Sequence, residues 1–198
     1  MDIAPVMPTL ILASSSLYRR ELLQRLTQAF ICQSPALDES PLANEDAEPL
    51  VRRLAEAKAR AIADAGGSGL IIGSDQAAVM NGKIIGKPGN HAAAVRQLQQ
   101  ASNNKLLFLT GLCVLNSETG QAQVDCIPCK VRFRDLDDAL IERYLQREQA
   151  YNCAGAFKSE GLGIALLASM ETSDPTALIG LPLIRLAQML ENEGFSVI

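Results

Sequence analysis

The 198-residue sequence contains a single histidine and no excess of basic residues, and each shortage excludes a class of function. Because His91 is the only imidazole, the chain offers no basis for a Ser–His–Asp triad, and we expect His91 to lie on the surface. A formal net charge of −4 argues against binding of a nucleic-acid polymer through a basic face. The Gly-x-Gly-x-x-Gly and Walker A patterns are also absent, which argues against dinucleotide-binding and P-loop folds.

Signals for a membrane or for secretion are missing as well. No apolar run approaches the roughly 20 residues that cross a bilayer. The start of the chain, Met1–Pro5, lacks the basic and apolar segments of a signal peptide. Five cysteines, an odd number, suit a reducing cytosol better than a disulfide framework. The sequence therefore predicts a cytoplasmic protein without a membrane partner.

Short apolar runs alternate with helical patterns, and a long antiparallel pair is inserted among them. The segments predicted to be strands are 9–14, 30–34, 69–73, 105–116 and 122–134, with a hairpin over 79–85. Helical spacing marks 18–28, 48–65, 91–101, 137–147 and 182–193. We expect one α/β domain over residues 1–198, built on a mixed twisted β-sheet covered by helices, with two lobes around a central cleft.

The first apolar run ends at three serines, and two arginines follow at the start of a predicted helix. Ser14, Arg19 and Arg20 could bind an anion there, because a helix N-terminus carries partial positive charge and guanidinium groups grip phosphate oxygens. The alternative is that the serines only cap the helix and the arginines are solvated.

Two charged residues occupy positions that favour chemistry. Asp75 is predicted at the carboxyl end of the strand over 69–73, where ligands gather in open α/β sheets; its alternative role is to cap the next turn. Lys58 falls on the apolar stripe of the helix over 48–65, so it must extend outward to water or meet an anion. With Glu39 and Lys87, in two proline-marked loops, these residues would suit metal-assisted attack on a polyphosphate.

Cys126 and Cys129 have the spacing of a redox pair or of half a zinc site. No second such pair exists, and the two residues fall in a strand-like stretch rather than at the start of a helix. A structural role is therefore the favoured interpretation.

Taken in order, these segments resemble the Maf family of nucleoside triphosphate pyrophosphatases over nearly the whole chain. The matching pieces are Ser14–Arg20, Asp38-Glu39, Ala57-Lys58-Ala59, Gly73–Gln76, Gly86-Lys87-Pro88, Thr110-Gly111 and Ala154–Gly161. The resemblance implies an ITPase-like fold with a nucleotide cleft, a small-molecule nucleotide substrate, a divalent cation (Mg²⁺ or Mn²⁺) and a homodimer. It also implies that Asp75 accepts a proton, that Asp75 and Glu39 serve the metal, and that Ser14, Arg19, Arg20, Lys58 and Lys87 contact phosphate.

Three positions resemble the branch of the family that hydrolyses 7-methyl-GTP: Tyr18, Gln76 and Glu160. N7-methylated guanine carries a positive charge, which an aromatic face attracts, and a carboxylate can accept hydrogen bonds from its N–H groups. Leu17 departs from the family pattern, which commonly has proline there, and should loosen the loop slightly. The alternatives are a pyrophosphatase for dTTP or UTP and a non-catalytic nucleotide-binding regulator of cell division.

Overall fold

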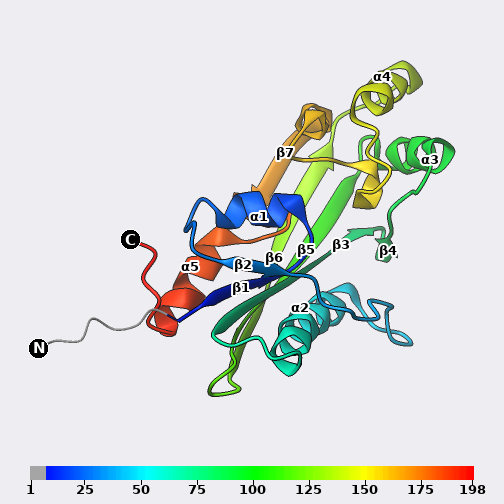
Figure 1. Cartoon of the computed structure of the whole chain (residues 1–198). Helices are drawn as coiled ribbons and strands as arrows, with labels where there is room; N and C mark the ends of the chain where they lie inside the picture. Colours follow the sequence, from blue (N-terminus) through cyan, green and yellow to red (C-terminus); the bar gives the residue numbers. More distant parts are fainter. Residues whose placement is uncertain (1–7) are drawn as a thin grey trace, which may run out of the picture.

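The computed structural model describes residues 8–198, so the expectation for Met1–Pro5 concerns residues outside the described part. Within residues 8–198, seven strands form one sheet in the order β2-β1-β3-β5-β6-β7, with β4 paired to β3 (Figure 1). The strands are β1 (Leu10–Ala13), β2 (Ile31–Gln33), β3 (Leu70–Met80), β4 (Lys83–Ile85), β5 (Lys105–Asn116), β6 (Ala122–Phe133) and β7 (Leu167–Thr172). Because β1 runs parallel to β2 and β3 while the other pairs are antiparallel, the predicted mixed sheet is confirmed.

Helices cover both faces of the sheet (Figure 1). They are α1 (Leu17–Leu23), α2 (Ala47–Asp64), α3 (His91–Ala101), α4 (Asp138–Glu148) and α5 (Leu183–Asn192), with short 3₁₀ segments at Ala154–Ala156 (η1), Leu162–Leu166 (η2) and Pro175–Ile179 (η3). The α2 helix packs on one face, and α1 and α5 pack on the other. The α3 and α4 helices cover the far end of the long strands. Among residues 8–198, no helix is long and apolar enough to cross a membrane.

Two predicted elements need correction, and one strand is missing from the prediction. The strand predicted over 69–73 continues to Met80. The polar residues Ser74–Gln76 suggest that the strand ends there, but β5 pairs with it along its length and supplies its backbone hydrogen bonds. The α1 helix ends at Leu23 rather than near residue 28, because its last turn tightens into short-range backbone bonds. The β7 strand was not predicted. The expectations of one domain and of two lobes stay predictions.

One edge of β3 is paired only at its two ends. The β1 strand covers Leu70–Ile72, and β4 covers Ala78–Met80. Over 73–77 this edge has no strand partner among residues 8–198, while the opposite edge is paired with β5 throughout. Successive residues point to opposite faces of a strand, so side chains from both faces of β3 can reach one space beside this open edge.

Two glycines let α2 approach the sheet closely. A Cβ on Gly73 would overlap the carbonyl oxygen of Ala55, and a Cβ on Gly111 would overlap that of Val51. In both places the obstacle is helix backbone, which cannot rotate away as a side chain can. The absence of these two Cβ atoms therefore sets the distance between α2 and the central strands.

We predict that Gly73→Ala destabilises the fold by about 2 kcal/mol, because the added methyl group forces α2 away from β3. Gly86→Ala is the matched control, since a Cβ there meets no atom within 4 Å. Urea unfolding of both variants measures the difference. Equal stability of Gly73→Ala and the parent chain would show that α2 can retreat without cost.

Candidate active site

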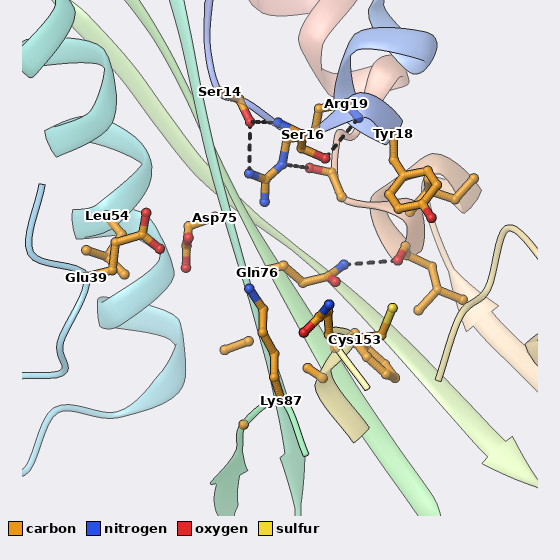
Figure 2. Close-up of a pocket in the computed structure, with 18 of the residues that line it drawn as sticks. Ser14, Ser16, Tyr18, Arg19, Glu39, Leu54, Asp75, Gln76, Lys87 and Cys153 are labelled. Carbon is orange, nitrogen blue, oxygen red and sulfur yellow. Dashed lines mark hydrogen bonds between the residues drawn. The ribbon is translucent and has the colours of Figure 1, made fainter. Parts of the chain in front are cut away.

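A pocket of about 580 Å³ lies beside the open edge of β3. Every predicted site residue except Arg20 lines it: Ser14, Tyr18, Arg19, Glu39, Lys58, Asp75, Gln76, Lys87 and Glu160. Figure 2 shows Tyr18 and Arg19 pointing inward from α1, Asp75 and Gln76 from β3, Glu39 from beside α2 and Lys87 from the loop after β4. The exposed Arg20 does not line the pocket, although Arg19 does. Neighbouring helical residues point about 100° apart, which explains why only one of the two faces the cavity.

The centre of the pocket holds a buried ion pair between α2 and β3. Lys58 Nζ lies 2.6 Å from Asp75 Oδ1 and 3.0 Å from Glu39 Oε1. Lys58 is 5% exposed and Asp75 is 9% exposed. Lys58 therefore does not extend outward to water; its buried ammonium contacts two carboxylates instead.

The predicted position of Asp75 at the end of its strand is wrong. Asp75 lies in the interior of β3, opposite Gly111 of β5. It is nonetheless accessible from the pocket because the β3 edge is open there. The strands whose carboxyl ends open onto the pocket are β1 and β2, since Ser14 and Ser34 follow them directly and line it. The pocket therefore lies at the carboxyl ends of β1 and β2, whereas Asp75 enters it from the interior of β3.

Ser14 and Ser16 have different roles around Arg19. Ser16 is the N-cap of α1, and its hydroxyl accepts a hydrogen bond from the Arg19 backbone N–H at 3.4 Å. The Ser14 hydroxyl instead accepts from Arg19 Nη1 at 3.4 Å, and Arg19 Nε donates to the Gly180 carbonyl at 2.9 Å (Figure 2). Burial lowers the pKa of Arg19 from its ordinary value, and the Asp75 and Glu39 carboxylates oppose that shift. The guanidinium is thereby fixed at the pocket wall.

Gln76 is oriented by three acceptors. Its Nε2 donates to the Thr110 hydroxyl at 3.0 Å and to the carbonyls of Ala177 and Leu178 at 2.9 and 3.1 Å. Thr110 donates its own proton to the Ala177 carbonyl, so its oxygen is free to accept from Gln76. The amide oxygen of Gln76 must then point away from these groups.

Sequence reasoning missed several lining residues. Phe108, Phe157 and Cys153 line the cavity, and the Gly180 carbonyl orients Arg19. Contacts of this kind join distant segments and leave no local pattern. Only Gly180, whose φ of +118° requires glycine, carries a local signal.

The cysteine pair lies away from this pocket. Cys126 and Cys129 fall within β6, three residues apart and therefore on opposite faces of the strand. Burial raises the pKa of each thiol to about 11. In the described range 8–198, no three or more histidine, cysteine or acidic side chains gather as a metal cluster. A structural role therefore remains the favoured interpretation for Cys126 and Cys129. The single histidine, His91, lies on the surface as expected.

The loop that carries Glu39 is tied to α2. Arg53 contacts both carboxylate oxygens of Glu45 at 2.7 Å and donates to the Ser40 carbonyl at 3.2 Å. Glu45 in turn accepts from the Leu42 N–H at 2.9 Å. These bonds fix the loop beside the helix that holds Lys58.

Comparison with known proteins shows which family this chain is similar to. The profile of the family described as "Maf-like protein" matches residues 9–193. A relative from Pseudomonas savastanoi, named 7-methyl-GTP pyrophosphatase, is 60% identical over 191 residues, which are 96% of this chain and 100% of the relative. A relative from Methylobacillus flagellatus with the same name is 55% identical, covering 97% and 100%. A solved dITP/XTP pyrophosphatase from Mycobacterium abscessus is 18% identical, with a TM-score of 0.43, over 65% of this chain and 75% of that one.

We predict a pH-dependent contribution of Glu45 to stability. Pairing with Arg53 lowers the pKa of the Glu45 carboxyl from 4.5 to about 2, so the stabilisation is complete above 4.5 and is lost as the pH falls through about 2. Glu45→Gln should therefore be less stable than the parent chain at neutral pH, and the difference should shrink across that acidic range. Urea unfolding at a series of pH values measures it, and a pH-independent difference would contradict this role of the ion pair.

Proposed function

The chain belongs to the Maf family, and from this premise we propose that it is a nucleoside triphosphate pyrophosphatase that hydrolyses 7-methyl-GTP to 7-methyl-GMP and pyrophosphate. Relatives that match almost the whole chain and bear that name support the proposal. The observation that carries it is the pocket itself, in which one buried carboxylate and three cationic side chains, Arg19, Lys58 and Lys87, line a single cavity.

In this proposal the cations bind the triphosphate and Asp75 activates water. Arg19, Lys58 and Lys87 offset the phosphate charge, and the Ser14 hydroxyl holds Arg19 in place. Lys58 contacts Asp75 Oδ1, so the other carboxylate oxygen takes a proton from water. The water oxygen forms a bond to the α-phosphorus while the bond from that phosphorus to the bridging oxygen breaks. Pyrophosphate then leaves. Arg20 stays a predicted phosphate contact although it does not line the pocket.

We propose that a divalent cation, Mg²⁺ or Mn²⁺, is held by Asp75 and Glu39. Both carboxylates contact the same Lys58 ammonium, so they face one region of the pocket, where a small cation would bind. Such ions are commonly bound by one or two carboxylates together with substrate phosphates, and the donor set fits that description. When bound, the cation would neutralise phosphate charge.

The base would be recognised by Tyr18, Gln76 and Glu160, which all line the pocket. The Tyr18 ring can attract a cationic base through its face. Guanine presents N–H donors, and the Gln76 amide oxygen and the Glu160 carboxylate are acceptors. We propose that the protein clears modified nucleotides in the cytoplasm, acting on small molecules rather than on nucleic-acid polymers.

A substrate comparison tests the proposal. Purified protein with Mg²⁺ or Mn²⁺ is given 7-methyl-GTP, GTP, dTTP and UTP, and pyrophosphate is measured separately from orthophosphate. We expect pyrophosphate chiefly from 7-methyl-GTP. A preference for dTTP or UTP would contradict the roles of Tyr18, Gln76 and Glu160 in base recognition. Tight binding without any turnover would favour a regulatory protein.

We predict that Asp75→Asn lowers turnover by at least about a hundredfold while nucleotide still binds, because the amide cannot accept the proton from water. Pyrophosphate release and calorimetric titration measure the two properties. Asp125→Asn is the matched control, since Asp125 is also ion-paired but lies outside the pocket. Turnover of Asp75→Asn close to that of the parent chain would remove Asp75 from the catalytic step.

A further inference from the structure

The ring of Tyr18, which lines the pocket and is proposed to bind the base, has a cationic neighbour. Lys158 Nζ lies 5.9 Å from the centroid of the Tyr18 ring. Tyr18 lines the cavity, whereas Lys158 is not one of the residues that line it. The ammonium therefore lies against the Tyr18 ring without being part of the cavity wall.

Glu148, at the last turn of α4, holds this ammonium. Its Oε2 lies 3.0 Å from Lys158 Nζ, and its Oε1 accepts a hydrogen bond from the Leu162 N–H at 2.9 Å. The carboxylate is tightly seated, since a Cβ on Gly161 would lie 2.6 Å from Oε1. The Leu162 N–H, followed by Lys158, lowers the pKa of Glu148, and Glu148 raises the pKa of Lys158. Both groups are therefore charged at neutral pH.

The charge behind an aromatic ring affects which bases the ring can attract. A ring face attracts cations through its quadrupole, and a second cation close to the same ring repels the first. An unpaired Lys158 would therefore disfavour a positively charged base on the cavity side of Tyr18, while a neutral base would be little affected. Glu148 cancels that charge locally.

We propose that Glu148 is a specificity-determining positioning residue, which neutralises Lys158 so that the Tyr18 side of the pocket accepts a positively charged base. This inference rests on the proposed function, because it presumes that an N7-methylated guanine lies against Tyr18. Glu148 acts through Lys158 and Tyr18 and touches no substrate. Its signature is a change in discrimination between charged and neutral bases rather than a general loss of activity.

The test is the ratio of kcat/KM for 7-methyl-GTP to kcat/KM for GTP, measured in the parent chain, Glu148→Gln, Lys158→Met and the double variant. Glu148→Gln leaves the ammonium unneutralised, so the ratio should fall about threefold or more. Lys158→Met removes the ammonium and should not lower the ratio. The double variant should return to the parent value. Lys130→Met is the control, because Lys130 pairs with Glu171 outside the pocket.

Other outcomes would overturn the inference. Equal losses for both nucleotides in Glu148→Gln would assign Glu148 a structural role only. A similar fall of the ratio in Lys158→Met would show that the contact of Lys158 with Tyr18 matters, rather than the neutralisation of Lys158 by Glu148. Dissociation constants of the two nucleotides, obtained by calorimetry, give the same ratio without turnover. If the parent chain binds both nucleotides but hydrolyses neither, the proposed function fails while the binding ratio still decides this inference.

Discussion

The ion pair between Lys58 on α2 and Asp75 on β3 is the constraint on which the site depends. Removing two charges from water costs several kcal/mol per ion, so the pair is tolerable only when the groups are in contact. The 2.6 Å separation requires α2 to lie close to the sheet, and the missing Cβ atoms of Gly73 and Gly111 make that approach possible. Apolar side chains of similar volume would stabilise this interface as well or better, which favours a functional reason for the charges.

The second constraint is the interrupted edge of β3. The β1 strand stops at Ala13, and β4 begins its pairing only at Ala78, so neighbouring residues of one strand face a common space from opposite sides. Asp75 reaches α2 on one face while Gln76 reaches η3 on the other (Figure 2). In the proposed function, neighbouring residues of this strand therefore serve the two ends of the nucleotide. Asp75 acts at the triphosphate, and Gln76 recognises the base.

Sequence patterns were sufficient for elements whose signals are local. The apolar stripe predicted for α2 includes Lys58, which the structure buries, and helical spacing predicts α3 with the bounds it has, His91–Ala101. Sequence patterns failed where pairing between strands decides the structure. The prediction puts Asp75 at a strand end, because nothing in the sequence reveals that β5 runs alongside β3 at that point. The partner of Lys58 and the Glu148–Lys158–Tyr18 contacts join residues that are distant along the chain, so only the folded structure brings them together.

The central claim of this account is that water activated at Asp75 attacks the α-phosphorus of a nucleoside triphosphate. Hydrolysis of 7-methyl-GTP in water labelled with heavy oxygen, followed by mass spectrometry of both products, tests it most directly. Attack at the α-phosphorus places the label in 7-methyl-GMP and leaves pyrophosphate unlabelled. Label in pyrophosphate, or release of labelled orthophosphate, would show attack at another phosphorus and would contradict the account.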